Sequence, residues 1–381
     1  MINFRIANEQ DRDSIIDFIN MVFSMLRVPH NFEAMLPKAY SKELGRADIH
    51  VIAEEDGRLC GCLGMHVFPM KVGDELLRVG YLGSMSVHPR VRGKGTMGEL
   101  MRRQLQRGEE MELDMIVLGG QRQRYQYSGF ETVGTAYVYN ISRSNVRHAF
   151  SDVDSEGIAF RSMDNGDIEY CLDLYNRQPV CGARTKENFI AVLNSYRNCA
   201  WAIEHCGKLI GYLCAAGDNK HICELVTSDE DAVSAVVKAW ITKHELINLR
   251  ITAAPHDTSL NTLLSRICEG FSITPICMMR ILNHQKVLSA YMKLKHQIEP
   301  LCFGKAVIEW EGAGCFALSV GEEGIAVRPA EEQICAENRF TNTQALQLFF
   351  GCNRFAAPAA RHEMPGNWFP LPFYIGEPDS F

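Results

Sequence analysis

The sequence lacks the patterns that would place it in a specialised class of protein. It has no run of 18 apolar residues, and its N-terminus has no basic segment followed by an apolar core. None of its 14 cysteines falls into a CxxC pair or a Cys/His set with zinc spacing. We therefore expect a soluble cytoplasmic protein with no signal peptide, reduced thiols and no metal.

An excess of positive charge is also missing. Lys and Arg total 39 against 46 for Asp and Glu, which gives a net charge of −7. This mild acidity argues against duplex DNA or another polyanion as a partner and slightly favours cationic or amine partners. We expect no nucleic-acid partner and, without a spanning segment, no membrane partner. Hydrophobic residues make up 46% of the chain, and 381 residues suffice for two or three domains.

A β-hairpin pattern occurs twice in the sequence. Residues 50–54 and 59–65 have the character of two strands joined through Asp56-Gly57. Residues 52–61 can be laid on residues 202–211 with Glu, Gly, Arg or Lys, Leu and Gly in register, at an offset of 150 residues. This spacing predicts two copies of one fold rather than a solenoid of short repeats. A chance likeness between two hairpins is the alternative.

Changes in composition indicate where the copies begin and end. We predict an α/β (α+β) protein with domains at residues 1–145, 146–283 and 284–381, the last being small and ending in an aromatic and proline-rich tail. The segments behind this prediction are a strand at 2–6, a helix at 13–26, a polar stretch at 140–157, a helix at 283–297, a hairpin at 307–320 and a capped helix at 341–350.

The sharpest local signal is a basic, glycine-rich turn between a strand and a helix. The strand covers residues 81–87, and residues 92–96 (Arg-Gly-Lys-Gly-Thr) open the helix. Glycines let backbone N–H groups approach a ligand closely, and the start of a helix presents unpaired donors, so this turn suits a pyrophosphate. A P-loop is excluded because His88 stands where its first glycine belongs.

Two other interpretations of the turn stay open. Residues 93–98 also match GxGxxG, and Asp114 follows Gly93 by 21 residues, as in dinucleotide-binding folds. In those folds the strand runs almost directly into the first glycine, whereas residues 89–92 intervene here. In the second interpretation, the turn is a basic surface loop that binds no ligand.

Val87-x-Pro89 followed by residues 92–96 resembles motif A of the GNAT acyltransferases, which cradles the pyrophosphate of acetyl-CoA. Met97 departs from the usual last Gly or Ala, as is typical of the enhanced intracellular survival (Eis) branch. The resemblance implies two tandem GNAT-type domains, a sterol-carrier-protein-like C-terminal domain and a homo-oligomer, a hexamer. It implies that acetyl-CoA binds to residues of the strand and the turn. These residues are Met85, Ser86, Val87, Arg92, Gly93, Lys94, Gly95 and Thr96.

The second copy lacks this turn. Its matching stretch, residues 224–232, has no glycine and no Arg, and three acidic residues stand where a helix begins. Acidic groups at a helix start cap it well but repel phosphates. We therefore expect the second domain to be a degenerate, structural copy.

Acetyl transfer to an amine needs an acid for the departing thiolate and a base for the amine. The segment from Tyr125 to Phe130 resembles the GNAT segment whose tyrosine hydroxyl lies beside the thioester sulfur. This makes Tyr125 the candidate acid, ahead of Tyr127, although both would also serve as packing aromatics. Eis-like proteins end in an aromatic residue whose α-carboxylate reaches the active site. The resemblance therefore makes the carboxylate of Phe381 the candidate base, with Asp379 or Glu377 as the fallback.

The sequence thus predicts an N-acetyltransferase that uses acetyl-CoA as co-substrate and acts by direct attack in a ternary complex. Its acceptor would be a primary amine of an aminoglycoside, a polyamine or a lysine. Two other functions stay open: a non-catalytic acyl-CoA sensor, and a lipid-binding protein that uses the sterol-carrier-like domain.

Overall fold

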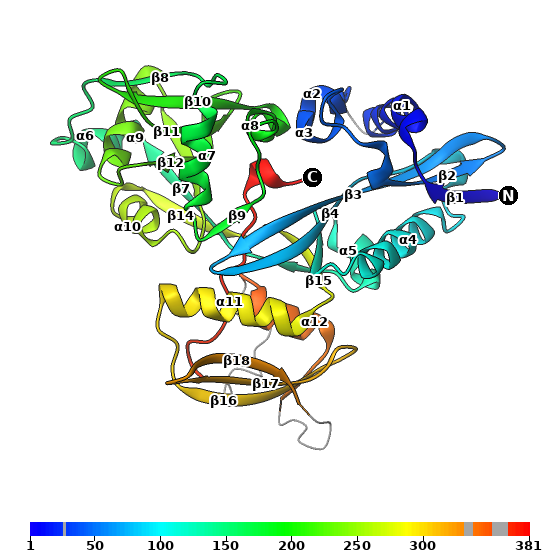
Figure 1. Cartoon of the computed structure of the whole chain (residues 1–381). Coiled ribbons are helices and arrows are strands. Elements are labelled where there is room, and N and C mark those ends of the chain that lie inside the picture. Colours follow the sequence, from blue (N-terminus) through cyan, green and yellow to red (C-terminus); the bar gives the residue numbers. More distant parts are fainter. Residues whose placement is uncertain (26–27, 331–337, 353–364) are drawn as a thin grey trace.

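The computed structural model describes residues 1–25, 28–330, 338–352 and 365–381. The described strands form three sheets, and helices pack around each sheet (Figure 1). No helix in the described part of the chain is long and apolar enough to cross a membrane.

The first sheet has eight strands in the order β1-β2-β3-β4-β5-β15-β6, with β9 paired to β3. Only β4 and β5 run parallel to each other. The strands are β1 (Ile2–Ile6), β2 (His50–Glu55), β3 (Arg58–Val72), β4 (Glu75–Val87), β5 (Met115–Leu118), β6 (Glu131–Val133), β9 (Val180–Gly182) and β15 (Cys277–Ile281). The helices are α1 (Arg12–Ser24), α2 (Phe32–Met35), α3 (Pro37–Tyr40), α4 (Thr96–Glu110) and α5 (Arg122–Tyr125). We call this sheet and α1 to α5 the first unit.

The second sheet has seven strands in the order β14-β7-β13-β12-β11-β10-β8. The strands are β7 (Ala136–Ser142), β8 (Ile158–Ser162), β10 (Asn198–His205), β11 (Lys208–Ala216), β12 (His221–Thr227), β13 (Asn248–Ala253) and β14 (Gly270–Thr274). The helices are α6 (Arg143–Ala149), α7 (Ile168–Asn176), α8 (Phe189–Leu193), α9 (Ala232–Lys243) and α10 (Thr258–Ile267). We call this sheet and α6 to α10 the second unit.

The two predicted hairpins share more than their sequence pattern. The β2–β3 pairing shifts register between Ala53 and Glu54, and the β10–β11 pairing shifts between Ile203 and Glu204, 150 residues later. Each unit also has, on a strand at the edge of its sheet, an arginine that binds two carboxylates. Arg5 binds Asp11 and Glu54, whereas Arg161 binds Asp167 and Glu204. The recurrence of the hairpin is therefore confirmed, down to its bulge and its ion pairs.

The two sheets exchange a strand in each direction. β7 follows the first sheet in the sequence but lies in the second, and β15 follows the second sheet but returns to the first, between β5 and β6. The predicted domain limits at residues 145 and 283 fall just after these two strands. The first predicted domain thus contains β7 of the second sheet, the second predicted domain contains β9 and β15 of the first sheet, and the limits themselves stay predictions.

The third sheet packs under the first unit through α11 (His284–Ile298), which lies between the two (Figure 1). Its strand order is β18-β17-β16-β19. The remaining elements are β16 (Gly304–Trp310), β17 (Gly314–Gly321), β18 (Gly324–Pro329), β19 (Asn338–Phe340) and α12 (Asn342–Phe350). These confirm the predicted helix, hairpin and capped helix, because Thr341 and Gln344 form a capping box at the start of α12.

Two expectations are modified. Twelve described cysteines are free thiols, but Cys315 is disulfide-bonded, which corrects the expectation that every thiol is reduced. The first predicted helix ends at Ser24 in the structure, and its last predicted residue, Leu26, lies outside the described residues.

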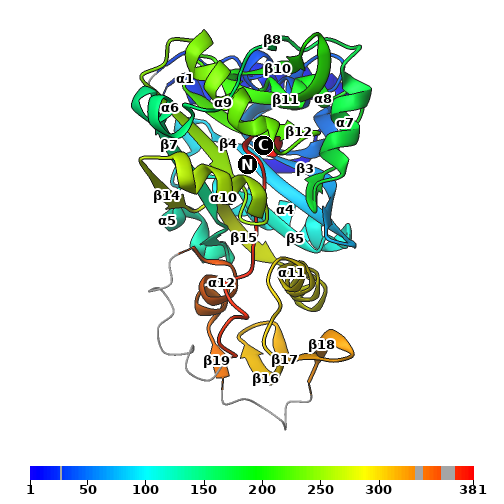
Figure 2. The same cartoon turned by 90° about the vertical axis from the view of Figure 1, so that its left-hand side faces the viewer.

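The C-terminal tail runs from the third sheet back to the two units (Figure 2). Trp368 is buried and donates from its indole Nε1 to the Cys302 carbonyl at 2.8 Å. The Thr135 N–H donates to the Phe373 carbonyl at 3.1 Å. The tail ends with Phe381, which is 7% exposed and belongs to the core shared by the first unit and the third sheet. The chain end is therefore packed rather than frayed.

Candidate active site

A cavity of about 870 Å³ opens in the first unit where β4 and β5 part. The two strands pair only from Val79 to Leu82 on the β4 side, although β4 continues to Val87. Ser84 has a φ of 57°, and the pairing of β4 with β3 shifts register beside it. This bulge bends β4, so its last residues leave β5 and border the cavity.

The glycine-rich turn borders the same cavity. Gly93 and Gly95 each have a φ of 78°, a left-handed conformation that favours glycine, and Thr96 begins α4. No side chain caps this helix, so the first N–H groups of α4 have no side-chain acceptor. Arg92 is exposed, and its Nε donates to the Val87 carbonyl at 3.3 Å. The turn thus offers N–H groups and a cation beside a strand edge.

Two of the residues predicted to bind acetyl-CoA do not line the cavity. Ser86 is 1% exposed, and its hydroxyl donates to the Ser84 carbonyl at 3.1 Å, so its side chain lies in the core. The Lys94 ammonium instead forms an ion pair with Glu55 at 3.2 Å. The other six predicted positions, Met85, Val87, Arg92, Gly93, Gly95 and Thr96, are lining residues.

Tyr125, the last residue of α5, also lines the cavity. The helix is clamped by Arg122, whose guanidinium donates to both oxygens of the buried Glu131 at 2.6 and 2.7 Å. Gly120 leaves room for the Tyr125 ring, because a Cβ there would lie 2.7 Å from Cε2. Burial raises the pKa of Tyr125 above its ordinary value. Tyr127, by contrast, is 87% exposed.

Phe381 brings the chain terminus to the cavity. Its ring stacks on Tyr40 at 6.0 Å between centroids and lies 6.0 Å from His66. Two glycines paired across β3 and β4 make room for it: a Cβ on Gly64 would lie 3.0 Å from the ring, and one on Gly83 would lie 2.9 Å from the terminal carbonyl carbon. The structure thus brings Phe381 and Tyr125 to one cavity, together with the turn.

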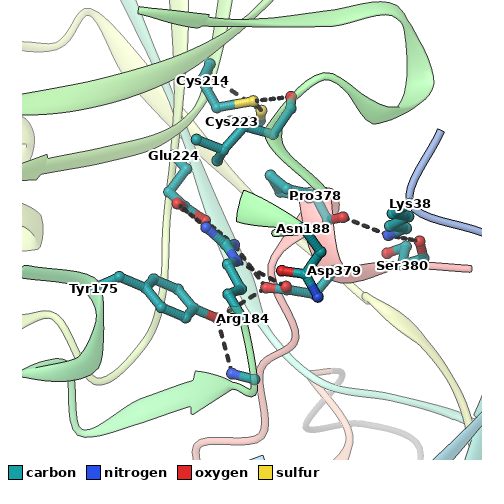
Figure 3. Close-up of polar contacts among 12 residues, drawn as sticks. Lys38, Tyr175, Arg184, Asn188, Cys214, Cys223, Glu224, Pro378, Asp379 and Ser380 are labelled. Atoms are coloured by element: carbon teal, nitrogen blue, oxygen red, sulfur yellow. Dashed lines mark hydrogen bonds and ion pairs between the residues drawn. The ribbon is translucent and has the colours of Figure 1, made fainter. Parts of the chain in front are cut away.

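The segment before Phe381 is held by a buried ion cluster, shown in Figure 3. Arg184 is buried between two carboxylates and donates to both oxygens of Asp379, at 3.0 and 2.8 Å, and of Glu224, at 2.7 Å each. Tyr175 donates to Asp379 and Tyr212 to Glu224. Burial opposes ionisation of Asp379, but the charge of Arg184 outweighs it and lowers the pKa of the carboxyl.

Lys38 completes the anchor from the first unit. Its ammonium donates to the carbonyls of Pro378 and Ser380 (Figure 3). Burial lowers the pKa of Lys38 to about 7. The fallback bases are engaged elsewhere, since Asp379 binds Arg184 and Glu377 accepts from the Asn198 amide at 3.4 Å. Of the three predicted bases, only Phe381 lines the cavity.

Asp114, which would bind a ribose in the dinucleotide interpretation, has another role. It is buried and accepts from the Arg78 N–H at 2.8 Å, the Lys286 ammonium at 2.8 Å and the Asn283 amide at 3.1 Å. It therefore fixes the start of α11 to the first sheet and does not face the turn.

Sequence reasoning missed several residues at the site. Tyr40 hydrogen-bonds to Ser84 Oγ at 2.5 Å and to His50 Nε2 at 3.2 Å, behind the cavity wall. Arg124 and Tyr196 line the cavity, the latter from the second unit. Glycines on two neighbouring strands of a hairpin are a sequence feature that could have indicated Gly64 and Gly83. No local sequence pattern predicts Tyr40 and Tyr196, which reach the site through packing.

Between the corresponding strands of the second unit, the described residues leave a much smaller space. β12 and β13 pair at only two positions, His221 with Arg250 and Ile222 with Ile251, so they also part. Residues 374–376 of the tail lie there, and the remaining space is about 80 Å³.

Residues 3–133 match a family model described as an acetyltransferase (GNAT) domain. No curated protein matches the sequence. Among solved structures, Eis1 from Mycobacterium abscessus is 16% identical, with a TM-score of 0.68 and coverage of 100% of both chains. A GCN5-related N-acetyltransferase from Anabaena variabilis is 17% identical, with a TM-score of 0.65 over 91% of this chain and 89% of that one. A counterpart from Kribbella flavida is 13% identical, with a TM-score of 0.65 over 91% and 88%.

At these identities the solved structures establish the fold of the whole chain, and the family model adds the activity class of the first unit. The predicted α/β fold with GNAT-type sheets is confirmed. Residues 3–133 thus form an acetyltransferase domain of the GNAT type, and the protein is an acetyltransferase.

Proposed function

We propose that this protein transfers the acetyl group of acetyl-CoA to a primary amine, by direct attack in a ternary complex. The observation that carries the proposal is that Tyr125 and the C-terminal Phe381 line one cavity with the glycine-rich turn. The amine of an aminoglycoside, of a polyamine or of a lysine would each satisfy this chemistry.

The first unit offers acetyl-CoA two kinds of contact. The open edge of β4, from Gly83 to Val87, has main-chain groups that the pantetheine arm would pair with. The turn from Arg92 to Thr96 has N–H groups at a helix start, which favour a diphosphate, and Arg92 adds positive charge. The side chains of Lys94 and Ser86 are engaged elsewhere, so these two residues would contribute main-chain groups alone.

The residues at the cavity supply both proton transfers. The α-carboxylate of Phe381 takes the proton that the amine loses as its nitrogen bonds to the acetyl carbonyl carbon. The Tyr125 hydroxyl gives its proton to the sulfur as the carbon–sulfur bond breaks. A tyrosine hydroxyl is protonated at neutral pH and is therefore available as a donor, and burial, which raises the pKa of Tyr125, keeps it so.

The acid is tested by replacing Tyr125 with Phe. We expect kcat to fall by about 10²-fold to 10⁴-fold, the usual contribution of a positioned acid. The KM for acetyl-CoA should change little. Tyr127→Phe is the matched control, since Tyr127 is exposed in the segment that follows. Equal turnover by Tyr125→Phe and Tyr127→Phe would remove the role of Tyr125, with thiol release as the measurement.

The base is tested by changing the chain end without changing the ring. A semisynthetic protein ending in Phe381 carboxamide keeps the side chain and loses the charge, so we expect it to bind acetyl-CoA normally and to lose amine-dependent thiol release. Phe381→Leu keeps the carboxylate and should retain the amine-dependent thiol release that the carboxamide loses. Full activity in the carboxamide would assign the base to another group, and CoA binding without turnover in the unmodified protein would favour an acyl-CoA sensor.

On the resemblance alone, we also propose a cytoplasmic homo-oligomer, a hexamer, whose third sheet belongs to a sterol-carrier-protein-like domain. Sedimentation of the purified protein tests the oligomer. Titration of the protein with a fluorescent sterol tests whether this domain binds lipid.

A further inference from the structure

One side of the cavity is built of aromatic rings that come from three parts of the chain. Phe23 of α1, Phe32 of α2, Tyr196 of the second unit and the terminal Phe381 all line it. Three of these rings are linked in series through Tyr40, with centroids 5.0 Å apart for Phe23 and Phe32, 5.5 Å apart for Phe32 and Tyr40, and 6.0 Å apart for Tyr40 and Phe381. We call Phe23, Phe32, Tyr196 and Phe381 the aromatic wall.

Tyr196 is held in this wall at a cost in backbone energy. Its φ is 59° and its ψ is 30°, and Arg197 after it also has a positive φ of 62°. Two successive non-glycine residues in the left-handed region are strained, and such strain persists where the surrounding structure enforces it, often at functional sites. The second unit thus contributes a strained aromatic residue to the cavity of the first.

The cavity also has little to attract a polycation. Among its described lining residues the charged side chains are Arg92 and Arg124, and none has a carboxylate side chain. The α-carboxylate of Phe381 is the anion that the chain places there. An amine with several ammonium groups would bury most of them without a partner, which is unfavourable. A molecule with one ammonium group leaves none unpaired.

The wall lies apart from the phosphate-binding turn. Phe381 meets β4 at Gly83, and the turn leaves β4 after Val87. Four residues of strand separate them, about 13 Å at 3.3 Å per residue. A ring on the wall and a diphosphate on the turn would therefore lie at different ends of the cavity, with the Phe381 carboxylate at the end that the wall forms.

We propose that the natural acceptor is an arylalkylamine, with one primary amine on an aromatic body. This inference rests on the proposed function and narrows its acceptor. Aminoglycosides and polyamines would be poorer acceptor substrates than a monoamine with an aromatic ring. The ring packs on the aromatic wall in the edge-to-face or offset arrangements that aromatic pairs prefer, and the amine points to the Phe381 carboxylate.

The test compares 2-phenylethylamine with 1,4-diaminobutane and kanamycin, with acetyl-CoA as co-substrate. We expect kcat/KM for 2-phenylethylamine to exceed that for either polycation by about 100-fold. Phe23→Ala should lower kcat/KM for 2-phenylethylamine by about 10-fold, mainly through KM, and leave 1,4-diaminobutane nearly unchanged. Phe271→Ala, at an exposed phenylalanine on β14, is the matched control and should change neither.

A second variant is designed to favour 1,4-diaminobutane over 2-phenylethylamine. Met35 lines the cavity from α2 and is half-buried, so Met35→Glu puts a carboxylate beside the aromatic wall. We expect this variant to gain activity with 1,4-diaminobutane and to lose activity with 2-phenylethylamine. Unchanged selectivity in both Phe23→Ala and Met35→Glu would overturn the proposal.

Failure of this inference is distinguishable from failure of the proposed function. Turnover of the polycations in preference to 2-phenylethylamine would overturn the arylalkylamine acceptor and leave the acetyltransferase proposal intact. Calorimetric titration of 2-phenylethylamine into the CoA-loaded protein tests the wall without turnover, and no heat of binding there would overturn it. If Phe23→Ala lowered kcat/KM equally for every amine, the aromatic wall would contact the acyl group rather than the acceptor. That result would also overturn the proposal.

Discussion

The two units share a hairpin, a bulge and an arginine with two carboxylates, yet they differ where their central strands part. The first unit has a cavity of about 870 Å³ there, and the second has about 80 Å³ beside the C-terminal tail. The pairing explains the difference. Gly64 faces Gly83 in the first unit, whereas Cys214, 150 residues after Gly64, faces Glu224 in the second. One position leaves room for the chain end, and the other carries the carboxylate that binds Arg184.

This difference shows how a copy without a cofactor turn still serves the site. The second unit holds Asp379 through Arg184, and Phe381 lies two residues further on, in the cavity of the first unit. It also contributes Tyr196 to the aromatic wall. Both units have the same arrangement of strands. The first unit carries the candidate active site, and the second carries the residues that anchor the C-terminal tail.

The largest effect is expected from removing the anchor. Arg184→Ala leaves the carboxylates of Glu224 and Asp379 buried without their cation, which costs about 3 to 5 kcal/mol of unfolding free energy. The tail should detach at the same time, so amine-dependent turnover should be lost. Urea unfolding and thiol release measure the two effects.

Arg161 provides the matched control within the same unit. Its side chain is 39% exposed, and it belongs to the ion pairs that both units share. Arg161→Ala should cost less than Arg184→Ala, because it leaves one buried carboxylate, Asp167, without its cation rather than two, and water reaches part of the site. If Arg161→Ala destabilised the protein as much as Arg184→Ala, the buried cluster would have no special role. Combining Arg184→Met with Glu224→Gln and Asp379→Asn should recover much of the stability, since no charge is then left unpaired.

The next effect concerns the glycine that gives the first unit its cavity. A Cβ on Gly83 would lie 2.7 Å from the Phe381 ring and 2.9 Å from its terminal carbon and oxygen. Gly83→Ala must therefore displace the chain end, and a displacement of about 1 Å at a reacting group typically costs about 10²-fold in rate. We expect kcat to fall by this amount while the affinity for acetyl-CoA stays within about 3-fold, measured by thiol release and calorimetry.

Gly98→Ala is the control for this substitution. Gly98 lies in α4, and a Cβ there would have no heavy atom within 4 Å other than its own helix backbone. Alanine in a helix is more favourable than glycine by about 0.5 to 1 kcal/mol, so this variant should be slightly more stable and fully active. Loss of activity in both variants would point to the fold rather than to the chain end.

The parts of the site that sequence analysis anticipated are those with a local signature. The hairpin has its Asp-Gly turn, the phosphate-binding turn has its glycines, and the places of Tyr125 and Phe381 follow from a resemblance between short motifs. Ser86 and Lys94 were assigned by the same motif, but strand alternation turns Ser86 into the core and Glu55 holds Lys94. A motif identifies a segment, whereas the direction of each side chain depends on its neighbours.

The remaining parts depend on contacts between distant segments. Lys38 binds the Ser380 carbonyl 342 residues away, and Arg184 binds Asp379 195 residues away. No periodicity or spacing encodes such pairs. The exchange of β7 and β15 between the sheets is of the same kind, because each strand is read correctly as a strand while its sheet is set by partners more than 100 residues distant.

The smallest expected effect is on how the free energy of unfolding depends on pH, and it concerns one buried histidine in each unit. Each unit sets a histidine against an aromatic residue of the tail: His66 lies 6.0 Å from Phe381, and His256 lies 5.9 Å from Tyr374. Burial lowers the pKa of each imidazole to about 4, from 6.5 for an exposed one. Between pH 6.5 and 4 the unfolded chain therefore binds more protons than the folded one, and stability falls as the pH falls. The slope is at most about 1.4 kcal/mol per pH unit for each histidine. Replacing His256, the more buried of the two, with Phe should flatten the profile measured by urea unfolding from pH 7 to 4.5, whereas the exposed His205→Phe should leave it unchanged. An unaltered slope in His256→Phe would mean that the pKa of His256 is not lowered in the folded protein.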